Sequence, residues 1–186
     1  MKKTCIVLIL SLTFINLCKA QKKFPKVNTN FNSKYRKSKE FFTGNINKSN
    51  YKTFIRILER ELDTIIPNGK SIMINFNQRA TNCHFANADI TNVTNKRIQT
   101  SSIMSKEHNA VYFFVYTKDA FHKDQHQKDK RFILDRGYFH RSVFTEHKNC
   151  KGIFVLKPNG EFLRYYGEDN YMDADTFLRE TAKWKK

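Results

Sequence analysis

The stretch IMINFNQRATNCHFA, residues 72–86, decides how the rest of the chain is interpreted. Its first half alternates in the manner of a β-strand, with Ile72, Ile74 and Phe76 on one face. A polar turn follows and holds one cysteine, Cys83. We therefore expect a strand that leads into a loop, on which Cys83 is a catalytic nucleophile, half of a structural disulfide or an incidental thiol.

The N-terminus has the three parts of a secretory signal peptide. Lys2 and Lys3 form a basic start, residues 4–17 are mainly apolar, and Ala20 supplies the small residue at the cleavage site. The apolar run is short for a membrane span and is interrupted by polar residues. We expect residues 1–20 to be removed, leaving an exported bacterial protein, periplasmic or secreted, without an integral membrane span.

The mature chain would be a single basic domain. Cleavage after Ala20 leaves 166 of the 186 residues, enough for one domain with its own core. The full chain has a formal net charge of +17, which attracts anionic polymers or lipid head groups. A solvated lysine-rich surface is the simpler interpretation. Two of the four cysteines remain, Cys83 and Cys150, and an even count in an oxidising compartment is typical of a disulfide.

Residues 21–45 and 46–69 precede the main domain and differ in character. The first segment is basic, rich in asparagine and without steady periodicity, which predicts an extended, partly disordered arm. Its aromatic residues alternate with lysines, so the arm either binds an anionic polymer or docks one or two aromatics on the domain. In the second segment, apolar residues recur at helical spacing until Pro67-Asn68-Gly69. This pattern predicts a helix with Ser49 or Asn50 as its cap.

Residues 70–186 contain the remaining predicted elements. Near-continuous β-formers predict a strand at residues 110–116 that is covered on both faces. A tight turn at Pro158-Asn159-Gly160 predicts a hairpin. The other expected elements are a strand at 71–77, a weakly patterned helix at 89–107, a short helix or loop at 119–130, a short strand at 131–134, a short helix at 138–146, and a last helix starting at Asp173 that turns Phe177, Leu178 and Trp184 inward.

This order of elements resembles a thioredoxin-like fold, and in particular exported thiol-disulfide oxidoreductases and alkyl hydroperoxide reductase-like proteins. In those families a strand of the type V-L-V-N-F-W leads into A-T-W-C-G-P-C. Residues 72–76 (IMINF) are similar to that strand, and residues 80–83 (ATNC) to the start of the motif. Residues 134–137 (LDRG) resemble the family's short strand that ends in Asp before a Gly turn, and residues 151–160 (KGIFVLKPNG) resemble P-T-T-F-L-I-D-P-D-G. The resemblance implies an α/β domain with a central mixed sheet flanked by helices.

The chain departs from the family at the positions that perform dithiol exchange. Ala86 stands where the resolving cysteine would be, and Lys151 occupies the slot of the cis-proline. A cis bond at a non-proline residue costs ~3 kcal/mol. Exchange on a C-x-x-C loop is therefore not available. We expect a non-catalytic binding or accessory module of the cell envelope, with a protein partner of unknown identity and without a cofactor.

The resemblance also brings the two mature cysteines together. In the family fold, the loop after the first strand lies against the loop before the hairpin, so Cys83 and Cys150 would be neighbours. They would form a structural disulfide, act as a redox pair in a thiol-disulfide oxidoreductase or peroxidase-like enzyme, with Cys83 as nucleophile and Cys150 as resolving thiol, or remain free. His84 beside Cys83 would favour a thiolate if it were protonated, or would be an ordinary loop histidine.

One histidine pair has the spacing of a metal site. Asp119, His122 and His126 could share one face of a helix, an arrangement that occurs in zinc sites. Lysines crowd the same segment and oppose a cation, so we expect no metal. His140 and His147 have no partner that the sequence reveals.

Overall fold

The computed structural model describes residues 26–180. The predicted signal peptide and Trp184 lie outside these residues. Within them, no helix combines the length and the apolar character that crossing a bilayer requires.

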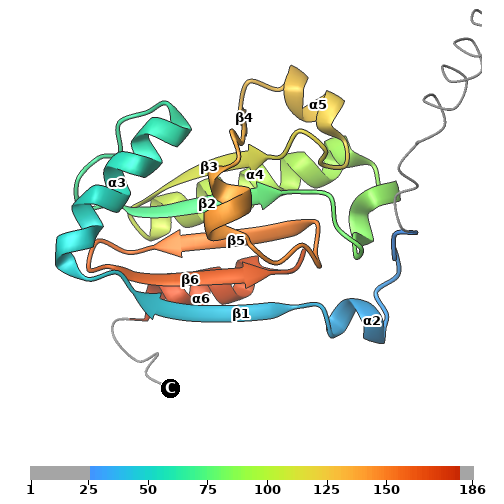
Figure 1. Ribbon diagram of the computed structural model, residues 1–186, viewed down its shortest axis with the longest axis horizontal. Coiled ribbons are helices and arrows are strands. Elements are labelled where there is room, and N and C mark those ends of the chain that lie inside the picture. Colours follow the sequence, from blue (N-terminus) through green and yellow to red (C-terminus); the bar gives the residue numbers. More distant parts are fainter. Residues whose placement is uncertain (1–25, 181–186) are drawn as a thin grey trace, which may run out of the picture.

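A six-stranded mixed sheet forms the centre of the molecule (Figure 1). Its strand order is β1-β6-β5-β2-β3-β4. Strand β2 is parallel to β3 and antiparallel to β5, and β5 is antiparallel to β6. This central arrangement confirms the predicted thioredoxin-like α/β fold. The strands are β1 Glu40–Asn45, β2 Ser71–Asn77, β3 Ala110–Tyr116, β4 Phe132–Leu134, β5 Lys151–Leu156 and β6 Glu161–Tyr166.

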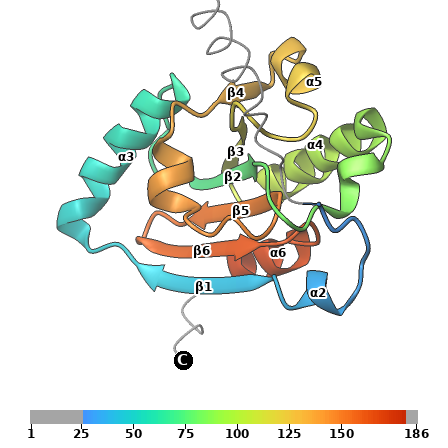
Figure 2. The same ribbon diagram turned by 45° about the vertical axis from the view of Figure 1, so that its right-hand side comes forward.

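Helices cover both faces of the sheet (Figure 2). One core includes Leu58 from α3 and Phe139, together with Ile72, Ile74 and Phe76 of β2. The opposite core includes Met104 and Phe177, from α4 and α6, with Met73 of β2. The predicted alternation along β2 is therefore confirmed. The helices are α2 Ser33–Arg36, α3 Lys48–Leu62, α4 Ile90–Glu107, α5 Lys123–Lys128 and α6 Tyr171–Arg179, with a 3₁₀ turn at His84–Asn87 and a π-helical turn at Phe139–Val143.

The prediction of an extended, partly disordered arm is wrong for residues 33–45. These residues form α2 and then β1, which pairs with β6 along its whole length. Tyr35 of α2 is fully buried, and its hydroxyl accepts a hydrogen bond from the Glu168 N–H at 2.8 Å. One anchored aromatic and the backbone pairing of a short strand are enough to order a segment of polar composition.

The ends of two helices differ from the prediction. Helix α3 is capped by the Asn47 side chain, which accepts from the Asn50 N–H, because asparagine at this position satisfies an otherwise unpaired amide. Helix α6 begins at Tyr171, two residues before the expected Asp173. The short helix expected at 138–146 is a single π-helical turn.

Candidate functional site

Cys83 and Cys150 form a disulfide that joins residues 67 positions apart. Cys83 lies in the loop after β2, and Cys150 immediately precedes β5. Their Cα atoms are 5.1 Å apart, within the ordinary range for a disulfide. Each cysteine is only 2% exposed. The neighbourhood implied by the family resemblance is confirmed, and the disulfide sits inside the protein.

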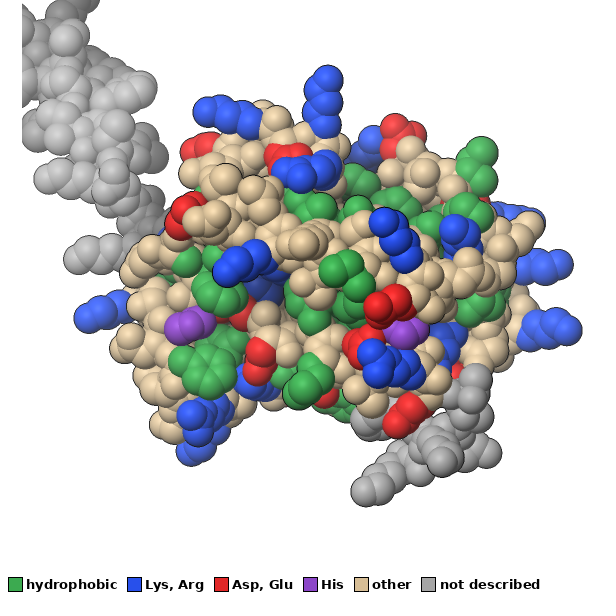
Figure 3. All heavy atoms as spheres, turned by 180° about the vertical axis from the view of Figure 1, so that it is seen from behind, with side chains coloured by type: hydrophobic (Ala, Val, Ile, Leu, Met, Phe, Trp, Pro, Cys, Tyr) green, Lys and Arg blue, Asp and Glu red, His purple; other side chains and the backbone are tan. Residues whose placement is uncertain are grey.

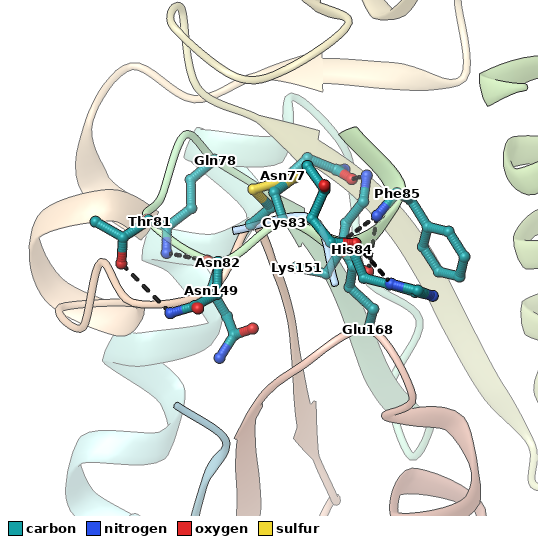
Figure 4. The surroundings of a disulfide bond; sticks show 12 residues. Asn77, Gln78, Thr81, Asn82, Cys83, His84, Phe85, Asn149, Lys151 and Glu168 are labelled. Atoms are coloured by element: carbon teal, nitrogen blue, oxygen red, sulfur yellow. Dashed lines mark hydrogen bonds between the residues drawn. A yellow bond between two sulfur atoms is a disulfide. The ribbon is translucent and has the colours of Figure 1, made fainter. Parts of the chain in front are cut away.

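The backbone on both sides of the disulfide is paired within the chain, and Figure 4 shows Gln78, Asn82 and Asn149 close to it. The Cys150 N–H donates to the Asn82 carbonyl at 3.0 Å, and the Asn82 N–H donates to the Lys148 carbonyl at 3.1 Å. The side-chain amide of Gln78 donates to the carbonyls of Glu146 and Asn149. The loop before β5 is therefore held along its length by the loop after β2.

A third segment covers this pair of loops, and we call residues 26–30 the strap. The Asn28 N–H donates to the Thr81 carbonyl at 2.8 Å, and the Cys83 N–H donates to the Asn28 carbonyl at 2.9 Å. Val27 packs against the apolar cluster that contains both cysteines. Figures 1 and 2 show this blue segment beside the green loop that follows β2.

His84 contributes to the attachment of the strap. Its Nδ1 lies 3.1 Å from the Thr29 carbonyl, to which it donates. The ring also lies against Phe31 and Tyr35, with centroid separations of 5.6 and 6.1 Å. The imidazole thus has a defined partner other than Cys83, and its neighbourhood includes the strap and α2.

Lys151, in the slot of the family's cis-proline, is buried beside the disulfide. Its ammonium donates to Asn77 Oδ1, and Arg97 Nη1 donates to the same oxygen at 3.1 Å. Burial lowers the pKa of Lys151 to about 7, the positive charge of Arg97 adds to the lowering, and Glu168 opposes it. The described residues contain no cis peptide bond, and Lys151 is the first residue of β5.

Glu168 supplies the negative charge near this cluster. Its carboxylate oxygens accept from the Phe85 N–H at 3.3 and 3.1 Å, which ties the 3₁₀ turn to the end of β6. Burial raises the pKa of Glu168, while Lys151, the Phe85 N–H and Arg97 act in the opposite direction. This cluster could not be predicted from the residue types, because charged residues are normally expected at the surface. Position 151 was the only member that the resemblance singled out.

Asp119, His122 and His126, the residues with the spacing of a metal site, do not converge as a possible ligand group among the described residues. Asp119 accepts from the Thr117 hydroxyl, His122 starts α5 with a left-handed backbone, and His126 is 2% exposed and stacks on Phe132. Burial lowers the pKa of His126 to about 3, with smaller contributions from nearby positive charges. Among the described residues, the group of possible metal ligands that does converge is Glu107, His108 and Asp175. There His108 and Asp175 are already paired at 2.7 Å.

His140 and His147 have a partner that the sequence did not reveal, namely each other. Their rings stack with a centroid separation of 4.1 Å. His147 Nδ1 donates to Gln78 Oε1 at 3.0 Å, so the pair supports the loop that leads to Cys150. Burial and the neighbouring His140 lower the pKa of His147.

The positive charge does not gather into one patch on the face shown in Figure 3. Lysine and arginine side chains are scattered there among acidic ones. Binding of an anionic polymer or of lipid head groups stays a prediction, based on the net charge of the whole chain.

No protein-family model matches the sequence, and the search of curated proteins gives no match. Among solved structures, the chain is similar to the thioredoxin domain of a thiol-disulfide oxidoreductase from Bacteroides vulgatus. The two share 17% sequence identity with a TM-score of 0.39, over 60% of this chain and 81% of that chain. The fold assignment above rests on the order and directions of the strands.

Proposed function

We propose that this protein is an exported, thioredoxin-like binding or accessory module of a bacterial cell envelope, without dithiol catalysis. The observation that carries the proposal is the burial of the Cys83–Cys150 disulfide under the chain's own strap. Exchange requires a thiolate to reach a disulfide sulfur, and two cysteines that are 2% exposed offer no such approach. The disulfide then acts as a structural staple.

The surrounding loops support the same interpretation. Ala86 occupies the position of a resolving cysteine, so Cys83 has no partner within its own loop. The backbone of residues 148–150 pairs with Asn82 and with the Gln78 side chain. An incoming polypeptide would have to displace these bonds before its own disulfide could approach Cys83.

The proposal is tested by dithiol exchange. The oxidised protein should not accelerate the reduction of insulin by dithiothreitol above the uncatalysed rate, and the Cys83→Ala variant should behave in the same way. The reduction potential of the disulfide should lie below about −300 mV, as in structural disulfides of exported proteins. A rate enhancement that disappears in Cys83→Ala would overturn the proposal.

A second candidate is a thiol-disulfide oxidoreductase or peroxidase-like enzyme that uses Cys83 as nucleophile and Cys150 as resolving thiol. The observation in its favour is the cationic surroundings, with Lys151 and Arg97 both buried next to the cysteine loops. Positive charge stabilises a thiolate. In the reduced protein, Cys83 should then react with iodoacetamide at about pH 6 faster than a model thiol does. Equal or slower reactivity excludes this candidate.

Export can be tested separately from chemistry. The intact mass of the protein recovered from expressing bacteria should correspond to cleavage after Ala20. Its mass should rise by two alkyl groups only when reductant precedes alkylation. A mass that retains residues 1–20 would contradict the export proposal.

A further inference from the structure

The strap is attached to the loop after β2 through main-chain hydrogen bonds of the kind that also bind peptide ligands. Its residue Asn28 both donates to and accepts from the loop after β2, through the Thr81 carbonyl and the Cys83 N–H. This forms a parallel bridge between Asn28 and Asn82, and Asn82 forms a second parallel bridge with Asn149. Peptide recognition by strand addition uses such main-chain bonds for affinity and side-chain seats for selectivity.

Three consecutive strap residues make separate contacts with the loop after β2. Val27 packs on the apolar cluster of Ala80, Cys83 and Cys150. The Asn28 side-chain amide donates to Asn82 Oδ1 at 3.0 Å. Thr29 contributes its carbonyl to His84. The groove therefore selects a peptide with a small apolar residue followed by asparagine. The next residue is bound only through its backbone carbonyl, so its side chain is not selected.

The groove has supports of its own. The disulfide ties Cys83 to the start of β5, and Asn82 is bonded to Lys148 through both its backbone N–H and its side chain. The strap itself is half-buried or exposed, whereas the next firmly buried residue, Tyr35, is anchored separately on Glu168. Asn28 is joined to Asn32, the N-cap of α2, by two exposed side-chain hydrogen bonds, and their loss leaves the Tyr35 anchor of α2 in place.

We infer that the groove formed by residues 80–84 is a peptide-binding site, which the strap fills in the free protein. Its ligand is an extended segment of a partner polypeptide that carries a small β-branched apolar residue followed by asparagine, the chemistry of Val27-Asn28. The inference rests on the proposed function, because it names the ligand of the binding module. The strap acts as an internal competitor that the partner segment displaces.

The test uses the full oxidised protein and a synthetic, end-capped peptide with the sequence of residues 26–31. Amide hydrogen exchange is followed at two positions of the protein. With excess peptide, the Asn28 amide of the protein should exchange at least about tenfold faster, because its Thr81 acceptor is taken. The Cys83 amide should stay protected, because the peptide's asparagine carbonyl replaces that of Asn28. A control peptide with aspartate for valine and alanine for asparagine should change neither rate.

A weakened strap makes the test sensitive. The Val27→Asp variant loses the apolar seat of its own strap, so it should bind the peptide more tightly than the wild type does, by at least about tenfold. Chemical denaturation checks that this variant keeps its fold, and Ile65→Ala, at a side chain that is 86% exposed and outside the groove, serves as a second variant that should bind like the wild type. No binding to a folded Val27→Asp variant would overturn the inference. A doubled molecular mass without any peptide effect would also overturn it, since the groove would then join two copies. The insulin assay is independent of both results and tests the proposed function alone.

Discussion

Removal of the disulfide is the perturbation whose size the structure determines best. The Cys83→Ala/Cys150→Ala double variant opens a loop whose ends are 67 positions apart in the sequence. On the chain-entropy model, closing a loop of this length restricts the unfolded chain by ~4 kcal/mol at room temperature. Because the folded state already pairs the two loops through backbone hydrogen bonds, the native structure should survive the substitution.

The expected result is a loss of about 4 kcal/mol in the free energy of unfolding. The denaturant m-value should change only through the extra surface that the unfolded chain exposes once the loop is open. In a domain of this size, that loss corresponds to a decrease of roughly 10 °C in the melting temperature. Urea denaturation, followed by circular dichroism, measures the free energy directly.

Two controls isolate the effect of the crosslink. The wild-type protein in excess reductant should show the loss that is due to the crosslink alone, because it keeps both buried sulfur atoms, whose removal adds a small cavity cost in the double variant. The Cys83→Ala single variant should lie between the two. A loss below about 1 kcal/mol in all three would refute the stabilising role of the disulfide, because closing the loop would then contribute almost nothing to the free energy of unfolding.

Three further substitutions test the buried polar groups. Between about pH 7 and the ordinary lysine pKa of 10.5, the unfolded chain holds a proton that the folded Lys151 releases, so stability should rise with pH. Lys151→Met should flatten this rise in denaturation curves measured from about pH 7 to 9.5. As pH falls from the ordinary histidine pKa of 6.5 towards about 3, this histidine binds a proton in the unfolded chain but not in the folded protein, where His126 is buried. Stability should therefore fall over this range. Melting temperatures should fall less steeply with pH in the His126→Phe variant. Tyr35→Phe should cost ~1–3 kcal/mol in urea denaturation, because the buried Glu168 N–H loses its acceptor.

The sequence predicts the sheet well because its strands carry their pattern locally. The alternation in β2 and the turn at Pro158-Asn159-Gly160 need no knowledge of distant residues. Helix α4 was weakly patterned for a physical reason. Its buried residues include Arg97 and Ser101 beside Ile90 and Met104. The buried face of the helix is therefore partly polar, and a pattern of apolar residues alone misses part of it.

The candidate site was predictable only in part. The family resemblance implied that Cys83 and Cys150 are neighbours, and they are, because the loop after β2 and the loop before β5 lie at the same end of two adjacent antiparallel strands. The strap has no such signal. It makes one bridge, has no repeat along the chain, and is held by partners more than 50 residues away in the sequence. Local composition therefore predicted an arm where the structure has a folded segment.

Lys151, at the position where the resembled family has a proline, has both a backbone role and a buried charge. Its backbone begins the β5 ladder opposite Asn77. The same residue places an ammonium in the interior, where Asn77 accepts from both Lys151 and Arg97. Such a buried network is costly to break at any single member and specifies one arrangement of the elements that meet there. A site organised in this way is suited to hold the cysteine loops in one arrangement. A structural disulfide and a preformed groove both require such rigidity. Dithiol exchange would instead require the loops to open repeatedly.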